Sequence, residues 1–147
     1  MNAKRIVFPT DFSTCSDAAL EHAAAMARNC DGTLLIVHVE EPPIAYGGGE
    51  MYYGLPEPDH EAVEKMLARV VPKTPVKYEH HLLMGSPADE VVRFAEDQQA
   101  DLIVMGTHGR TGMRRVLMGS VAETVVRKAL CPVITMKQPE PQAAAAK

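Results

Sequence analysis

Aromatic residues are scarce in this chain: tryptophan is absent, and only 5% of the residues are aromatic. Stacking on nucleic-acid bases is therefore not expected as its main activity. The net charge of −4 argues against a broad surface for nucleic acid or anionic membranes, although it leaves room for one local basic loop. No apolar stretch approaches the roughly 20 residues that span a bilayer, and the N-terminus lacks the apolar core of a signal peptide. We expect a cytoplasmic protein that binds neither nucleic acid nor membrane.

Paired cysteines and the common phosphate-binding motifs are missing too. The three cysteines, Cys15, Cys30 and Cys131, are odd in number and lack CxxC spacing, which indicates reduced thiols in the cytosol. The sequence contains no GxxxxGK[ST] motif and no GxGxxG motif after the first expected strand. It therefore supports neither a P-loop NTPase nor a dinucleotide-binding protein. No carboxylate cluster stands ready as a dedicated set of magnesium ligands.

The chain does contain a regular alternation of apolar runs and helix-favouring segments. Strands are expected at 4–8, 33–39, 76–84, 101–105 and 131–137, and helices at 14–29, 60–71, 87–98 and 122–130. This alternation predicts an α/β, Rossmann-like fold, with a five-stranded parallel sheet in the order 3-2-1-4-5 and helices on both faces. We expect one domain over 1–137 and a flexible tail over 138–147. The sequence leaves three alternatives for the connection 40–59: a lid, a dimer contact or a disordered segment.

The most distinctive segment is the connection 105–122, which joins the fourth expected strand to the last helix. Its glycines let the backbone approach a ligand closely. Basic side chains lie among them: His108, Arg110, Arg114 and Arg115. Gly119 and Ser120 fall where the last helix should begin, among unpaired N–H groups at the positive end of the helix dipole. Glycines, basic side chains and a helix N-terminus together predict a phosphate site.

The expected topology points to the same place by a separate route. Ligands of such sheets bind at the carboxyl ends of the strands, where the strand order reverses. Here the reversal is expected between the first and fourth strands. Pro9, Thr10 and Asp11 follow the first of these strands, and the loop 106–120 follows the other. We therefore expect these two segments to form the walls of a ligand crevice.

The spacing Gly106-x2-Gly109-x9-Gly119-Ser120 resembles the nucleotide-binding signature of the universal stress proteins, in the branch that binds ATP. The flanking sequence resembles the same family at 9–13, 85–88, 100–109 and 131–133, so the likeness spans residues 3–137. The resemblance implies an ATP-binding protein that acts as a nucleotide-dependent regulatory module in the stress response. It also implies a homodimer.

Carried onto this sequence, the resemblance implies a site with two ends. The adenosine would face Pro9, Thr10, Asp11 and Val39. The phosphates would face the loop and the first turn of the last helix: Met105, Gly106, Gly109, Gly119, Ser120, Val121 and Ala122. Apart from the resemblance, we expect the basic side chains of His108 and Arg110 in the same loop to contact the nucleotide. Ala122 stands where some members carry a hydroxyl, so one phosphate contact is missing. Mg²⁺ would be held mainly by the phosphates, with Asp11 or water completing its shell.

Simpler explanations exist for several of these residues. For Asp11 the alternative is a cap near the start of the helix 14–29, and for Gly119-Ser120 it is a plain N-cap. The arginines of the loop could form a solvated surface stripe. Elsewhere, His38 is expected to be a satisfied core histidine. His80 and His81 should point to opposite faces of their strand, which rules out one shared metal ion.

The sequence shows no convincing general base beside the phosphate loop, so efficient ATP hydrolysis is not predicted. Two alternatives stay open: a slow ATPase or phosphotransferase that uses His108 or Asp11, and a nucleotide-free structural or chaperone-like dimer. The last strand is apolar and would lie at an edge of the sheet. Because an exposed edge is normally covered or paired, we expect a homodimer through 132–136.

Overall fold

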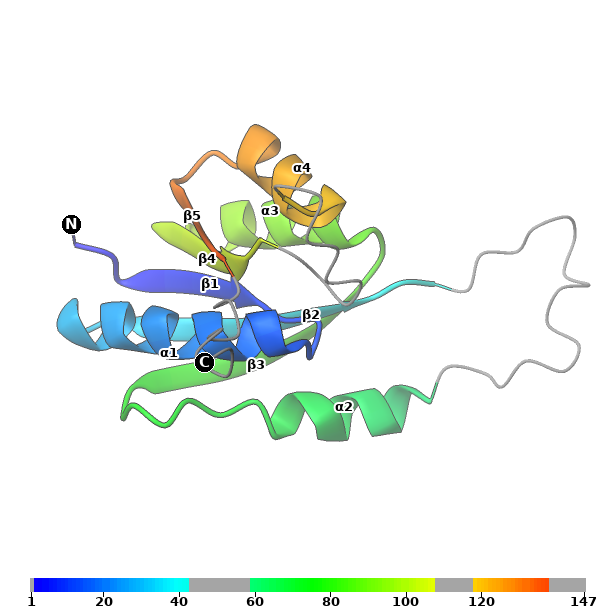
Figure 1. Ribbon diagram of the computed structural model, residues 1–147, viewed down its shortest axis with the longest axis horizontal. Coiled ribbons are helices and arrows are strands. Elements are labelled where there is room, and N and C mark those ends of the chain that lie inside the picture. Colours follow the sequence, from blue (N-terminus) through cyan, green and yellow to red (C-terminus); the bar gives the residue numbers. More distant parts are fainter. Residues whose placement is uncertain (1, 43–58, 108–117, 138–147) are drawn as a thin grey trace, which may run out of the picture.

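A computed structural model describes residues 2–42, 59–107 and 118–137 of the chain (Figure 1). Strands and helices alternate throughout, as predicted. In chain order they are β1 (Arg5–Pro9), α1 (Thr14–Asn29), β2 (Thr33–Glu40), α2 (His60–Ala68), β3 (Lys77–Met84), α3 (Pro87–Asp97), β4 (Leu102–Gly106), α4 (Ser120–Lys128) and β5 (Val133–Met136). The expectations for the tail 138–147 and for most of the 40–59 connection lie outside the described residues.

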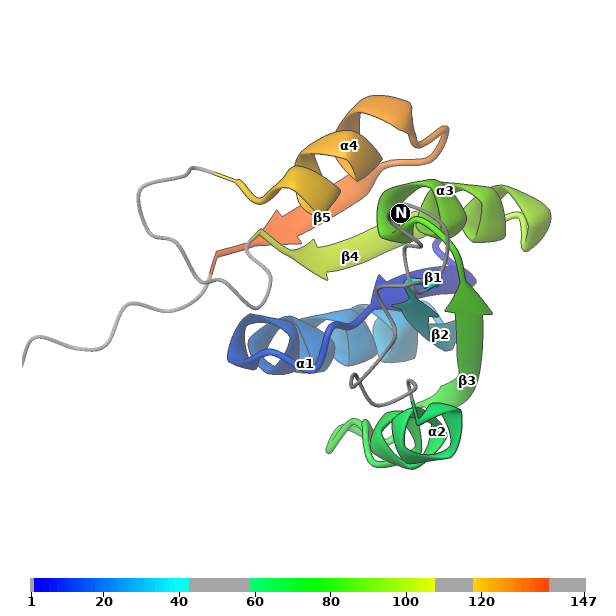
Figure 2. The same cartoon turned by 90° about the vertical axis from the view of Figure 1, so that its right-hand side faces the viewer.

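The five strands form one sheet in the order β3-β2-β1-β4-β5, and every neighbouring pair is parallel. The predicted fold class and strand order are therefore confirmed. Helices α1 and α2 cover one face of the sheet, and α3 and α4 cover the other (Figures 1 and 2). The strand order reverses between β1 and β4, so the carboxyl ends of these two strands open side by side.

The apolar runs of the strands are continuous because both faces of the sheet are covered. Neighbouring residues of β2 show this: Leu34 packs in the core beneath α1 and α2, whereas Leu35 packs beneath α3 and α4, and both are fully buried. Alanines make up most of the buried side of α1. Their small side chains let this helix lie close to the strands.

The ends of the helices follow local capping chemistry. Ser13 caps α1, and its Oγ accepts a hydrogen bond from the Ser16 N–H at 3.3 Å. Ser86 is the N-cap of α3 with proline in the first turn, as predicted. Helix α4 begins at Ser120 rather than Ala122 and ends at Lys128, because Gly119 already serves as its N-cap and Ala129 turns extended. None of the helices described is long and apolar enough to cross a membrane.

Candidate functional site

A cavity of about 560 Å³ opens at the carboxyl ends of β1, β2 and β4. This volume lies in the usual range for small-molecule sites. Every predicted site residue that the structure describes lines the cavity: Pro9, Thr10, Asp11, Val39, Met105, Gly106, Gly119, Ser120, Val121 and Ala122. His108, Gly109 and Arg110 were predicted as well, and these three lie outside the described residues, as do Arg114 and Arg115.

Asp11 holds the turn between β1 and α1 in shape. Its Oδ1 accepts hydrogen bonds from the Ser13 N–H at 2.9 Å and from the Ser16 Oγ at 3.0 Å. The cap of α1 is Ser13, so Asp11 orders the turn that precedes the cap instead of capping the helix itself. The carboxylate is thus fixed at the cavity wall by partners on the protein side.

His38 braces the same turn from the neighbouring strand. Its Nδ1 lies 2.7 Å from the Thr10 carbonyl oxygen, and because a carbonyl only accepts, this nitrogen carries a hydrogen. The imidazole also packs against the Phe12 ring, with 4.3 Å between the centroids. Phe12 adopts the left-handed backbone conformation, with φ of 66°. His38 is satisfied, as predicted, but it is half-buried and lines the cavity.

Backbone hydrogen bonds join the two ends of the loop that is predicted to bind phosphate. The Gly119 N–H donates to the Thr107 carbonyl oxygen at 2.6 Å, and the Thr107 N–H donates to the Met136 carbonyl oxygen at 2.9 Å. These bonds bring the end of β4, the start of α4 and the end of β5 together. The start of α4 is thereby fixed against the sheet.

The N-terminus of α4 is well suited to an anion. Gly119 is the N-cap in an extended conformation, and as a glycine it has no side chain with which to cap the helix. The first N–H groups of a helix lack partners within the helix and carry the positive end of its dipole. Since Gly119, Ser120, Val121 and Ala122 all line the cavity, this positive end belongs to the cavity wall.

Packing alone requires a glycine at position 106. A Cβ at this position would lie 2.6 Å from the Cys15 Sγ, closer than real side chains approach one another. Cys15 lies in the first turn of α1 and is buried. The sequence had attributed this glycine to ligand approach, whereas in the structure it also admits α1 to the end of β4.

The opposite end of the cavity is acidic. Glu40 and Glu41 line it at the end of β2, and neither was singled out from the sequence. The Glu40 Oε2 lies 2.7 Å from the His60 Nδ1, which joins β2 to the first residue of α2. The hydrogen bond with Glu40 raises the pKa of His60. One signal was available in the sequence: both glutamates directly follow the predicted strand that ends at Val39.

Other polar groups found from the sequence do not assemble a metal site. His80 and His81 diverge as predicted: the His80 Nε2 lies 2.8 Å from the Val70 carbonyl oxygen, whereas the His81 ring packs on Phe94. Across the described ranges, no group of three or more His, Cys, Asp or Glu side chains is arranged to hold a metal ion.

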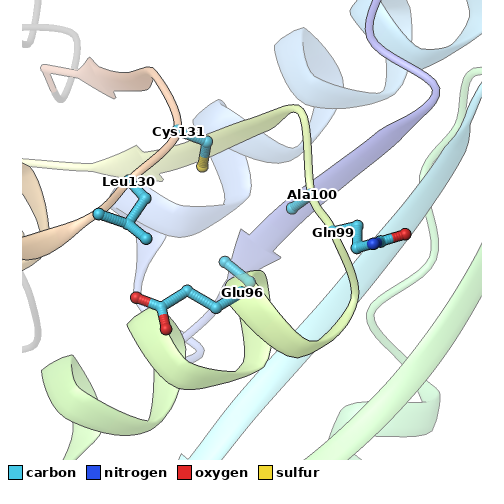
Figure 3. Close-up of a pocket in the computed structure, with 6 residues that line it drawn as sticks. Glu96, Gln99, Ala100, Leu130 and Cys131 are labelled. Carbon is cyan, nitrogen blue, oxygen red and sulfur yellow. The ribbon is translucent and has the colours of Figure 1, made fainter.

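A smaller cavity, of about 270 Å³, lies near the amino-terminal ends of β4 and β5 (Figure 3). Its wall combines the end of α3 with Leu130 and Cys131 from the connection between α4 and β5. Burial raises the pKa of the Cys131 thiol, which disfavours the reactive thiolate. This cavity therefore offers little chemistry.

Comparison with known proteins agrees with this fold. The sequence matches the Universal stress protein family over residues 2–137. It is 39% identical to a universal stress protein of Methanocaldococcus jannaschii, over 93% of this chain and 84% of that relative. The solved structure of another Methanocaldococcus jannaschii protein covers 96% of this chain and 100% of its own, with 28% identity and a TM-score of 0.78. A universal stress protein from Archaeoglobus fulgidus, solved in complex with dAMP, covers 92% and 98%, with 31% identity and a TM-score of 0.67. This chain belongs to the universal stress protein family.

Proposed function

We propose that this chain binds ATP in the cavity at the carboxyl edge of the sheet, and that it acts as a nucleotide-dependent regulatory module in the cytoplasm during stress. One observation carries the proposal: a helix N-terminus with glycine as its N-cap and the turn that holds Asp11 face one cavity of about 560 Å³. The relative from Archaeoglobus fulgidus in complex with dAMP supports an adenine nucleotide as the ligand.

The nucleotide would lie across the ends of the strands. Its phosphates would meet the N–H groups of Ser120 and the following residues, because the Gly119 N–H already donates to the Thr107 carbonyl oxygen. His108, Gly109 and Arg110 would complete the loop. Its adenosine would lie toward Asp11 and Val39, and Mg²⁺ would be held mainly by the phosphates. Calorimetric titration of ATP with Mg²⁺ into protein stripped of carried-over nucleotide tests this. Saturable binding is expected, and its absence would overturn the proposal.

A regulatory role is preferred to catalysis because of how Asp11 is engaged. A general base must reach the proton that it removes, and the Asp11 Oδ1 already accepts two hydrogen bonds from the turn. The competing hypothesis is a slow ATPase or phosphotransferase that uses His108 or Asp11. A His108→Ala variant separates the two: loss of turnover with unchanged ATP affinity would favour the enzyme.

We also propose that the chain forms a homodimer through 132–136. Strand β5 lies at an edge of the sheet, and all of its residues are partly exposed. Apolar side chains of α4 and its end are exposed nearby, with 45% exposure at Val126 and 83% at Leu130. Pairing of two copies about a two-fold axis would cover this edge. A stable monomer in sedimentation at micromolar concentration would refute it, whereas a dimer without nucleotide affinity would favour the purely structural alternative.

A further inference from the structure

Glu40 is the most unusual polar side chain at the cavity. It is the last residue of β2, it lines the cavity, and its side chain is only 9% exposed. The Oε2 is paired with the His60 Nδ1 at 2.7 Å. The Oε1 is buried, and no hydrogen-bond partner for it exists among the described residues. Buried acceptors without a donor are rare in folded proteins and need an explanation.

The pairing with His60 holds the carboxylate in place while leaving one oxygen for another donor. His60 is itself anchored, because its Nε2 lies 3.1 Å from the Glu64 Oε1. The terminal torsion of a glutamate has a broad energy profile, so small rotations that turn an oxygen toward the cavity cost little. A ligand in the cavity that carries an N–H or O–H group would supply the missing donor.

The position of Glu40 in the sheet indicates which part of a nucleotide it meets. The phosphate end of the cavity lies at β4 and α4, and β2 is two strands away across β1. Neighbouring strands lie about 4.8 Å apart, so these ends of the cavity are separated by about 10 Å. In a nucleotide the base is the part farthest from the terminal phosphate. The exocyclic 6-amino group is the donor that adenine offers on its edge, beside acceptor nitrogens.

We propose that Glu40 recognises the base: its free carboxylate oxygen accepts a hydrogen bond from the 6-amino group of adenine. This inference rests on the proposed function. The cavity then has opposite electrostatic ends, a helix N-terminus for phosphate and a carboxylate for the amino group. Glu40 thereby makes the site selective for adenine over purines that lack this donor, and His60 acts as the residue that positions Glu40.

Three probes and matched variants test this assignment by calorimetry. The probes are ATP, purine riboside 5′-triphosphate, which lacks the 6-amino group, and 2′-deoxy-ATP. The wild type should bind ATP roughly ten- to a hundredfold more tightly than purine riboside triphosphate, the range for a hydrogen bond to a charged group. Glu40→Leu should lower the affinity for ATP by about the same factor and leave purine riboside triphosphate unchanged. Glu61→Leu, which removes an exposed carboxylate in the first turn of α2 that does not line the cavity, should keep the preference.

Glu40→Gln provides a second variant that preserves size and one acceptor oxygen, and it should show a smaller loss of preference than Glu40→Leu. Equal affinities of the wild type for ATP and purine riboside triphosphate would overturn this inference and leave the proposed function intact. Persistence of the preference in Glu40→Leu would overturn it too. If Glu40→Leu instead erases a preference for ATP over 2′-deoxy-ATP, the carboxylate contacts the sugar and the assignment to the base is wrong. Failure of the wild type to bind any of the three would overturn the proposed function itself.

Discussion

Replacing Gly106 with alanine is expected to destabilise the fold through a single contact. The new Cβ would lie 2.6 Å from the Cys15 Sγ, while the next atoms, the Cβ and carbonyl carbon of Cys15, are 3.4 Å away. The thiol has little room to withdraw, because Cys15 is 2% exposed and its Sγ lies 3.7 Å from the Met136 carbonyl oxygen. Overpacking of this kind costs about 1–3 kcal/mol, which corresponds to about 2–4 °C in melting temperature for each kcal/mol.

The clash predicts a specific rescue. Cys15→Ala alone should cost roughly 1 kcal/mol for the lost burial of the sulfur. In the double variant the Sγ is gone, so the alanine at 106 meets only atoms at 3.4 Å. The double variant should therefore be at least about 1 kcal/mol more stable than the sum of the single changes predicts.

Urea denaturation followed by circular dichroism measures each free energy of unfolding. Combining Gly106→Ala with Cys131→Ala is the control: Cys131 lies near the amino-terminal ends of β4 and β5, whereas Gly106 is at the carboxyl end of β4, so the two effects should simply add. The packing explanation is refuted if the Gly106→Ala and Cys15→Ala effects add within about 0.5 kcal/mol, or if Gly106→Ala is as stable as the wild type.

Three further predictions concern charge and the sheet edge. Partial burial opposes ionisation of Glu21, but hydrogen bonds from the backbone N–H groups of Lys73 and Thr74 outweigh it and lower the pKa of Glu21. The stability that Glu21 adds should be present above its unfolded pKa and lost as the pH falls through its folded pKa. Glu21→Gln should remove this part of the acid dependence of the free energy of unfolding in urea titrations. The raised pKa of His60 predicts that its pairing with Glu40 contributes its full stability below the usual histidine pKa of about 6.5 and loses it as the pH rises through the raised pKa. NMR titration should show a lower His60 pKa in Glu40→Gln, and an unchanged pKa would contradict the pairing. Finally, the Ile103 N–H donates to the Pro132 carbonyl oxygen and the Thr107 N–H to the Met136 carbonyl oxygen. The backbone groups of the even-numbered residues of β5 therefore face β4, and the Thr135 N–H faces the free edge. Thr135→Pro should yield a monomer in sedimentation while Thr135→Val stays dimeric, and a dimeric proline variant would place the interface elsewhere.

Much of the fold could be predicted because its signals are local. Helix α1 runs from Thr14 to Asn29 as expected, since a serine cap precedes it and Asp31-Gly32 follows it. The alternation of elements predicted a parallel sheet with helices on both faces, and placing the reversal between the first and fourth strands predicted the order that the structure shows. The cavity wall at Asp11, Gly106 and Gly119 followed from the same topology.

The features that escaped prediction depend on contacts between distant segments. The pairing of Glu40 with His60 spans a connection whose path the sequence does not determine. The apolar strand around His38 predicts a core residue. However, β2 extends to Glu40, and the end of this strand, including His38, lies at the cavity. The packing of Gly106 on Cys15 joins residues that are far apart in the chain, and no periodic pattern reports such a contact.

The central claim, that α4 presents its N-terminus to nucleotide phosphate, is tested most directly at Gly119. Its φ of −68° and ψ of 162° suit any residue, and both aspartate and asparagine are good N-caps, so Gly119→Asp and Gly119→Asn should fold equally well. They differ in one negative charge at the proposed phosphate site. Calorimetry with ATP and Mg²⁺ should show saturable binding to the stripped wild type and to the asparagine variant, and none to the aspartate variant. Equal binding by the two variants, or no binding by the wild type, would contradict the account.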